Sequence, residues 1–134
     1  MKKNKFSKNW IIKQKRDIYV KKSKLEGYRS RAVYKLQEIN DKFKIIKNNI
    51  SVIDLGAAPG SWSQYISRNF SNSKIISIDL KDIEPIKNLI HIKGDFTEEQ
   101  QKKNIKNYFG KKVDLIVSDM AVNTTGNKLS LIHI

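Results

Sequence analysis

The sequence predicts an α/β protein built on a doubly wound, mostly parallel sheet and preceded by a basic helical arm. Short apolar runs alternate along the chain with stretches of helical period, which is the pattern of βα units. Each apolar run is followed closely by an acid, and the run at residues 51–55 breaks at once into a turn of small residues. Parallel strands with such ends are typical of folds that bind ligands at the carboxyl edge of the sheet.

The N-terminal third predicts two helices. A basic helical arm is expected over residues 9–25 and ends where Gly27 interrupts the pattern. A second helix is expected over residues 31–43, with Ser30 as its N-cap. Its apolar face would be formed by Val33, Leu36, Ile39 and Phe43. Lys35 falls near the edge of that face, so its stem can pack while its amine reaches into a cleft.

The rest of the chain predicts alternating strands and helices. Strands are expected over residues 51–55, 74–79, 89–93 and 113–118, and helices over residues 61–70 and 97–109. Thr97 and Gln100 have the spacing of a capping box, and Gly110 would end the last helix. The segment 83–87 contains a proline and is expected to be a short turn or helical piece. The sheet would be cut short after its fourth strand, leaving an exposed edge that the apolar residues 129–134 cover in part.

Charge is distributed unevenly. The chain of 134 residues carries a formal charge of +14, and residues 1–49 hold 16 Lys and Arg against 4 Asp and Glu, a net charge of +12. This predicts a basic helical region, 1–49, that contacts RNA and packs on the same domain as residues 50–134. A Lys-rich surface set by genomic base composition is the plain alternative, but it does not explain the asymmetry. Arg29 and Arg31 are therefore the expected RNA contacts.

Composition excludes several classes of protein. No apolar run approaches the roughly 20 residues that a membrane-spanning helix needs, and the basic N-terminus lacks the apolar segment of an export signal. A cytoplasmic protein without a membrane partner is expected. With no Cys and only His91 and His133, neither a disulfide nor a thiolate nucleophile nor a metal site is expected.

The turn after the first predicted strand can lie against a ligand. The sequence VIDLGAAPGSWSQY at residues 52–65 places Gly56 and Gly60 around small side chains, so a ligand can approach the backbone and the N–H groups that open the next helix. The glycine spacing matches neither the dinucleotide fingerprint nor a phosphate loop. An ordinary strand-to-helix turn, chosen for close packing, is the alternative.

Each of four predicted strands has an acid at its C-terminal end or within two residues of it: Asp54, Asp79, Asp95 and Asp119. The carboxyl ends of parallel strands form one edge, so these acids are expected to converge on one crevice. Asp79 follows Gly56 by 23 residues, about where doubly wound folds place an acid that accepts hydrogen bonds from a ribose. Asp95, one strand further out, suits the exocyclic amine of adenine. For any single acid, capping of a helix is the alternative role.

Taken together, these motifs resemble the bacterial FtsJ-type ribosomal RNA 2′-O-methyltransferases. The resemblance runs from about residue 10 to residue 123, and the motifs are YRSRAVYKLQEI (28–39), VIDLGAAPGSWSQY (52–65), the acid of IISIDL (75–80), GDF (94–96) and SDMAVN (118–123). It implies a Rossmann-like methyltransferase fold, S-adenosylmethionine as cofactor, and a uridine ribose of large-subunit (23S-type) ribosomal RNA in the assembled subunit as substrate.

The resemblance also implies roles for single residues. Gly60 and Trp62 would lie in the cofactor cradle, Asp79 at the ribose, Asp95 at the adenine and Asp119 beside the methionine end. Residues 50–134 would form the S-adenosylmethionine-binding methyltransferase domain, in incomplete form.

Catalysis would need residues that align the ribose 2′-oxygen with the methyl carbon and remove its proton. A free lysine is mostly protonated at neutral pH, so a lysine base needs desolvation or neighbouring cations. The family resembled uses two lysines, an aspartate and a glutamate, and Lys35 and Asp119 match the first lysine and the aspartate. After Asp119 the sequence offers only Lys128 and no glutamate. Val122 and Ser61 replace a proline and a glycine of the family pattern.

These departures leave more than one expectation open. The first is a truncated or frameshifted methyltransferase that retains cofactor-site residues while its catalysis is impaired. The second is a non-catalytic remnant that still binds RNA or the ribosome. An NAD-type oxidoreductase half-domain is disfavoured by the glycine spacing. The complete protein would be monomeric, whereas a truncated chain would self-associate through its open sheet edge.

Overall fold

The computed structural model of the protein describes residues 2–110 and 113–119. In this part of the chain, parallel strands form one sheet in the order β3-β2-β1-β4. The strands are β1 (Ser51–Leu55), β2 (Lys74–Asp79), β3 (Leu89–Lys93) and β4 (Leu115–Ser118). The α/β class and the parallel sheet are confirmed. The predictions on residues 122, 128 and 129–134 lie outside the described residues.

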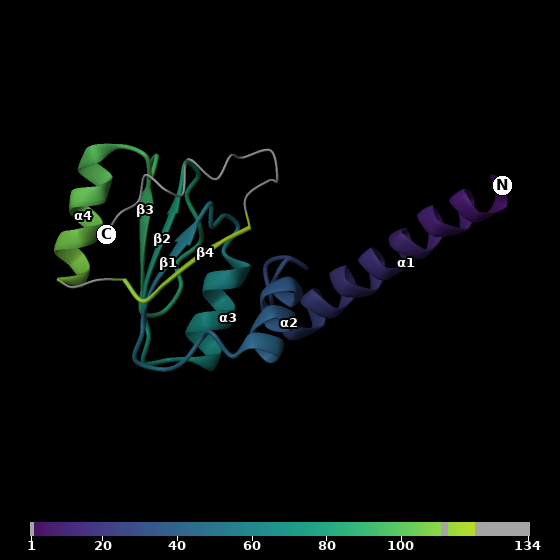
Figure 1. Ribbon diagram of the computed structural model, residues 1–134, viewed down its shortest axis with the longest axis horizontal. Helices are drawn as coiled ribbons and strands as arrows, with labels where there is room; N and C mark the ends of the chain where they lie inside the picture. Colours follow the sequence, from purple (N-terminus) through teal and green to yellow (C-terminus); the bar gives the residue numbers. More distant parts are fainter. Residues whose placement is uncertain (1, 111–112, 120–134) are drawn as a thin grey trace.

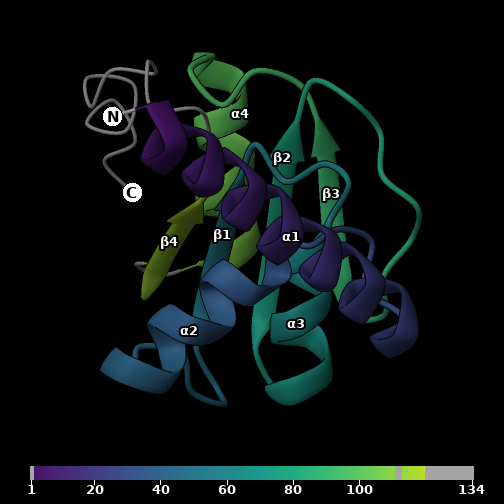
Figure 2. The same cartoon turned by 90° about the vertical axis from the view of Figure 1, so that its right-hand side faces the viewer.

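Helices cover both faces of the sheet. They are α1 (Lys2–Glu26), α2 (Val33–Phe43), α3 (Ser61–Asn69) and α4 (Glu99–Phe109). Helices α2 and α3 lie on one face and α4 lies on the other, while α1 projects away from the body on the side of α2 (Figure 1). Turned by 90°, α1 runs diagonally across the front of the sheet, and α2 and α3 lie below it in the picture (Figure 2). None of the described helices combines the length and apolar character needed to cross a membrane.

Strand β1 is the centre of the core because it is paired on both sides and buried on both faces. Its side chains alternate between the two faces. Val52 packs into the cluster under α2 and α3, with Leu36, Ile66 and Ile75, whereas Ile53 packs into the cluster under α4, with Ile78, Ile105 and Phe109. Asp54 therefore points to the α2 and α3 side. The first three strands match the predicted bounds because each apolar run is closed by polar or turn residues.

The predicted N-terminus of α2 is wrong. The helix begins at Val33, and the Ser30 hydroxyl donates to Ser61 Oγ at 2.8 Å instead of capping the helix. The predicted apolar face is also partly wrong, because Phe43 is 63% exposed. Asn40 Oδ1 accepts a hydrogen bond from the Ile46 backbone N–H at 2.8 Å, so the chain turns back and Ile46 takes the buried place.

The predicted capping box of α4 is wrong as well. The Thr97 backbone N–H and hydroxyl both donate to Asp95 Oδ1, at 2.8 and 2.6 Å, and α4 begins only at Glu99. Gly110, with φ of 64°, ends α4 as predicted, because that left-handed conformation suits glycine. The arm α1 is longer than predicted. Residues 81–87 form no regular helix or strand.

Candidate functional site

Three adjoining cavities lie at the carboxyl edge of the sheet. The first, of about 260 Å³, is lined by residues that follow β1, β2 and β3: Gly56, Ile78, Asp79, Leu80, Gly94, Asp95, Phe96 and Thr97. The second, of about 60 Å³, lies beside the turn before α3, and Gly56 lines both. The third, of about 550 Å³, lies between α1 and α2, and it shares Ser30, Ala32 and Asp119 with the second. The cavities therefore form one row.

The first cavity combines carboxylates with apolar walls. Asp79 Oδ2 accepts a hydrogen bond from the Ala58 backbone N–H at 3.0 Å, and its Oδ1 accepts from the Lys81 N–H at 2.8 Å. Asp95 is oriented by its two bonds from Thr97. Since each carboxylate oxygen can accept more than one hydrogen bond, these carboxylates are held in place and can still accept from a ligand.

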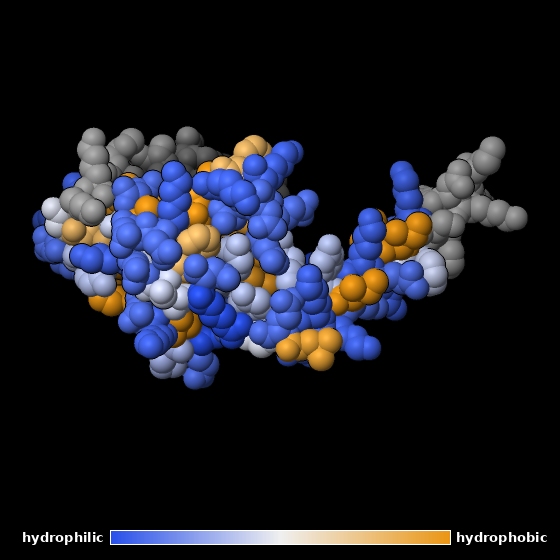
Figure 3. All heavy atoms as spheres, turned by 90° about the horizontal axis from the view of Figure 1, so that it is seen from below, coloured by the Kyte–Doolittle hydropathy of each residue, from blue (hydrophilic) through white to orange (hydrophobic). Residues whose placement is uncertain are grey.

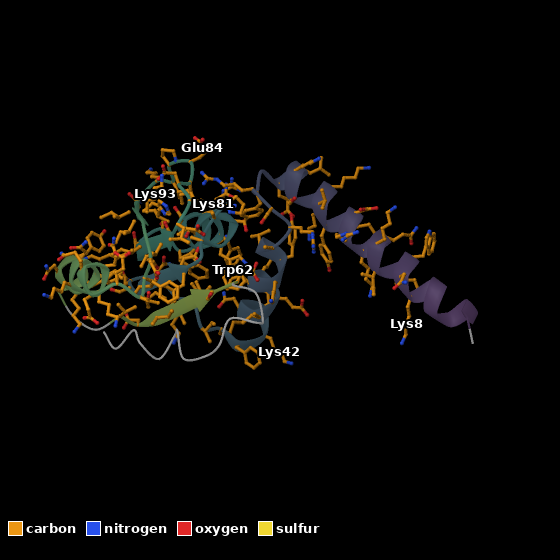
Figure 4. All side chains as sticks on the ribbon, turned by 90° about the horizontal axis from the view of Figure 1, so that it is seen from above. Lys8, Lys42, Trp62, Lys81, Glu84 and Lys93 are labelled. Atoms are coloured by element: carbon orange, nitrogen blue, oxygen red, sulfur yellow. The ribbon has the colours of Figure 1, made fainter. Side chains whose placement is uncertain are left out.

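The turn after β1 is fixed on β2. The backbone N–H groups of Gly56 and Ala57 both donate to the Ile78 carbonyl, at 2.8 and 3.2 Å. Gly60 has φ of 109°, a conformation that favours glycine. Trp62 is 6% exposed, and its Nε1–H donates to the Ala32 carbonyl at 2.7 Å, which ties α3 to the segment before α2. Figure 4 shows Trp62 inside the body near α2.

Asp54 is the buried acid of the site. Its side chain lies on the second cavity, it is 2% exposed, and its Oδ2 accepts a hydrogen bond from the Ser63 hydroxyl at 2.7 Å. Burial raises the pKa of Asp54 to about 7; the hydrogen bonds from Ser63 lower it in part, and the charges of Asp119 and Asp79 raise it further. A carboxyl that titrates near neutral pH in a cleft is typical of functional sites.

Lys35 and Asp119 meet where the second cavity joins the third. Lys35 Nζ lies 3.4 Å from Asp119 Oδ1, and the two side chains are 67% and 36% exposed. The third cavity also contains Arg31 and Glu38 from the α2 side and Tyr19 from α1. Tyr19 stacks on Tyr34 with 5.4 Å between ring centroids, which brings the arm to the site.

The structure brings together the acids predicted to converge, although they line two adjoining cavities rather than one. It separates the two predicted RNA contacts: Arg31 lines the third cavity, while the Arg29 guanidinium donates to the carbonyls of Pro59 and Pro85. Sequence reasoning missed Tyr19 and Thr97. The Asp-x-Thr spacing is a recurrent side-chain turn and could have indicated Thr97; no local pattern indicates that Tyr19 meets α2.

Three comparisons with known proteins point in one direction. A family model described as FtsJ-like methyltransferase matches residues 28–132. Proteins named Ribosomal RNA large subunit methyltransferase E include one from Pelagibacter ubique (strain HTCC1062), 65% identical over 96% of this chain and 63% of its own length. Another, from Rickettsia akari (strain Hartford), is 49% identical over 91% and 56%. This chain spans about three fifths of the length of these relatives.

A solved structure is similar as well. The crystal structure of a chain described as a ribosomal RNA methyltransferase from Plasmodium falciparum aligns with a TM-score of 0.65 and 39% identity. The alignment covers 77% of this chain and 62% of that chain.

Proposed function

Since the chain belongs to the FtsJ-like methyltransferase family, we propose that it binds S-adenosylmethionine and serves the 2′-O-methylation of a uridine ribose in large-subunit ribosomal RNA. One observation carries the proposal: three cavities lie in a row, and the Lys35 and Asp119 pair stands where the small central cavity meets the largest one. This order suits a cofactor at one end and an acceptor at the other.

The residues of the first two cavities fit the cofactor chemically. Ile78, Leu80 and Phe96 offer apolar contact to an adenine ring, and Asp79 and Asp95 offer acceptors for its ribose hydroxyls and amine. The glycines of the turn after β1 leave room for a ligand against the backbone. Asp54 and Asp119 line the central cavity, where two carboxyl groups suit a ligand that carries positive charge.

The chain supplies part of the chemistry around the acceptor. When bound, S-adenosylmethionine supplies a methyl group on a positively charged sulfur. Lys35 Nζ, in its neutral form, would accept the proton of the 2′-hydroxyl as that oxygen takes up the methyl group. Asp119 accepts a hydrogen bond from Lys35 Nζ and so directs the amine toward the junction of the cavities. Arg31, in the same cavity, holds an RNA phosphate.

The cofactor assignment is tested by calorimetric titration with S-adenosylhomocysteine. Asp79→Asn should weaken binding about 5- to 150-fold, because it removes a charged acceptor for the ribose and about 1 to 3 kcal/mol of binding free energy. Asp82→Asn is the matched control, since Asp82 is exposed, pairs with Lys93 and lines none of the three cavities. A folded chain that binds no S-adenosylhomocysteine contradicts the proposal.

The reaction is tested by transfer of a labelled methyl group to large ribosomal subunits that lack the modification. Lys35→Ala should abolish transfer, whereas Lys42→Ala, an exposed lysine at the end of the same helix, should leave it unchanged. The Pelagibacter relative, which is longer, serves as the reference. Slower transfer by the 134-residue chain would agree with the expectation that it keeps the cofactor-site residues while its catalysis is impaired. Equal transfer by wild type and Lys35→Ala would remove Lys35 from the mechanism.

A further inference from the structure

Arg29 lies in the short segment between α1 and α2, and its guanidinium is bound to backbone. Its Nη1 donates to the Pro59 carbonyl at 2.9 Å and its Nη2 donates to the Pro85 carbonyl at 3.1 Å. Its backbone N–H donates to Gln64 Oε1 on α3 at 2.8 Å. One residue thus joins the segment before α2 to α3, to the turn after β1 and to the loop after β2.

The two loops that Arg29 holds belong to the cofactor side of the site. Pro59 lines the central cavity. A Cβ placed on Gly60, the next residue, would lie 3.0 Å from Arg29 Nη1, 3.3 Å from Ile86 Cδ1 and 3.5 Å from Ile83 Cδ1. The guanidinium therefore packs closely on the turn and against the loop after β2, whose first residue, Leu80, lines the first cavity.

The residues directly after Arg29 belong to the acceptor side. Ser30 and Arg31 line the 550 Å³ cavity, and the Ser30 hydroxyl and Ala32 carbonyl are hydrogen-bonded to Ser61 and Trp62 of α3. Arg29 itself is not among the residues that line any of the three cavities. Arg29 therefore lies between the turn on the cofactor side and the segment on the acceptor side, and it lines no cavity on either side.

We propose that Arg29 is a positioning residue that fixes the cofactor turn and the acceptor segment relative to each other without contacting either ligand. The proposal rests on the proposed function. A guanidinium suits this role because its planar fork presents donors in fixed directions to two carbonyls at once, whereas an ammonium is a compact point charge. The charge of Arg29 alone would instead suggest a contact with an RNA phosphate.

Substitution of Arg29 by lysine distinguishes the positioning role from a contact with an RNA phosphate. Arg29→Lys keeps the positive charge, so it would preserve a phosphate contact, but it loses the fork. We therefore expect Arg29→Lys to weaken S-adenosylhomocysteine binding about tenfold, measured by calorimetry. For both Arg29→Lys and Arg29→Ala, the salt dependence of affinity for a fragment of large-subunit ribosomal RNA should keep the wild-type slope, because no phosphate contact is lost.

Arg68→Lys is the matched control. The Arg68 guanidinium also donates to two backbone carbonyls, those of Glu26 and Gly27 at 3.0 and 2.8 Å, but neither belongs to the cofactor turn. It should leave S-adenosylhomocysteine affinity within about twofold of wild type. An equal loss in both variants would overturn the proposal, since the effect would then be general loosening. Normal affinity in Arg29→Lys, with a flattened salt slope in Arg29→Ala, would make Arg29 a phosphate contact.

Amide hydrogen exchange gives a readout that needs no ligand. The Ala58 N–H, which donates to Asp79 Oδ2, reports on the cofactor turn. Faster exchange at Ala58 in Arg29→Lys but not in Arg68→Lys supports the positioning role. This holds even if the wild-type chain fails to bind S-adenosylhomocysteine, because that failure would overturn the proposed function alone. Unchanged exchange at Ala58 in Arg29→Lys would overturn the positioning role.

Discussion

Among the residues of the site, Asp54 has surroundings that couple it to pH. Its carboxyl is buried under α3, beside the charges of Asp79 and Asp119, and burial raises its pKa from an ordinary value near 3.8 to about 7. The folded protein therefore holds a proton at Asp54 over a pH range in which the unfolded chain has released it. Folding then becomes less favourable as pH rises through this range.

We expect the free energy of unfolding to fall between about pH 4 and pH 7, and this contribution to level off at higher pH. The slope should reach about 1.4 kcal/mol per pH unit, and the free energy of unfolding should fall by about 4 kcal/mol over the whole range. Asp54→Asn should remove this component and be more stable than wild type at pH 8, because the amide can still accept from Ser63 and carries no charge. Urea unfolding of both proteins at several pH values measures the difference.

Asp82→Asn provides the control for that measurement, because Asp82 is an exposed acid on the loop after β2. It should follow the wild-type pH profile. Parallel profiles for wild type and Asp54→Asn would show that Asp54 does not hold the proton.

The acids of the site could be placed from the sequence, whereas Arg29 could not. Asp54, Asp79 and Asp119 lie within one residue of the end of their strands, so their place at the carboxyl edge follows from strand geometry. The carbonyls that bind Arg29 are 30 and 56 residues away along the chain, and backbone acceptors leave no signature in the side-chain sequence. From charge alone, Arg29 and Arg31 look equivalent.

Helix α1 is a basic helix that projects from the body of the molecule (Figure 1). Residues 2–26 contain ten Lys and Arg against two Asp and Glu. The end of α1 near the body is held by Tyr19 and by Lys22, whose Nζ lies 4.7 Å from the centre of the Tyr34 ring. The rest projects outward, and its surface mixes hydrophilic and hydrophobic side chains (Figure 3). Trp10 and Ile18 are among its exposed residues, at 58% and 63%. We expect this basic helix, which lies beside the third cavity, to bind the RNA backbone.

We expect α1 to contribute phosphate contacts from the face that carries Tyr19. Lys8 and Lys15 precede Tyr19 by eleven and four residues, spacings that return to the same face of a helix, and Figure 4 shows Lys8 far out on α1. Replacing both with Gln should flatten the logarithmic salt dependence of RNA affinity by about two, one for each lost phosphate contact. Filter binding over a range of salt concentrations measures the slope.

Replacement of Lys103 and Lys106 with Gln is the matched control, because both are exposed on α4, across the sheet from α2 and α3. This variant should keep the wild-type slope. If both pairs flatten the slope equally, RNA binding does not depend on α1 in particular.

Element types were predictable from the sequence, while their ends were less so. Strands β1, β2 and β3 follow from apolar runs that turn residues enclose. The N-terminal ends of α2 and α4 were mispredicted because hydroxyls suited to capping bind elsewhere: Ser30 to Ser61 and Thr97 to Asp95. In both places a contact near the site replaces the local helix cap, so tertiary structure overrides the local signal.

For the whole molecule, the order of the strands decides which surface is left open. In the described part of the chain, β3 and β4 are the edge strands. Strand β3 carries His91 and Lys93, and charged or polar residues discourage pairing with another chain, whereas β4 reads Leu-Ile-Val-Ser. Ile116 is 39% exposed although its neighbour in the sheet, Ile53, is fully buried. The alternation of strands and helices could be predicted from the sequence. The difference in exposure between Ile116 and Ile53 could not, because it depends on where α4 packs.

We expect the 134-residue chain to self-associate as its concentration rises, through the edge and apolar side chain of β4. Ile116→Lys should shift the chain toward the monomer, because a lysine on an edge strand opposes the approach of a second apolar edge. Sedimentation velocity over a hundredfold range of concentration measures the change. Ile90→Lys on β3 is the matched control: Ile90 is 42% exposed on the other edge strand, which already carries polar residues, so this variant should associate like wild type. Equal effects of the two lysines would mean that added charge, rather than the β4 edge, governs association. A wild-type chain that stays monomeric over the whole range of concentration would show that β4 offers no edge to a second copy.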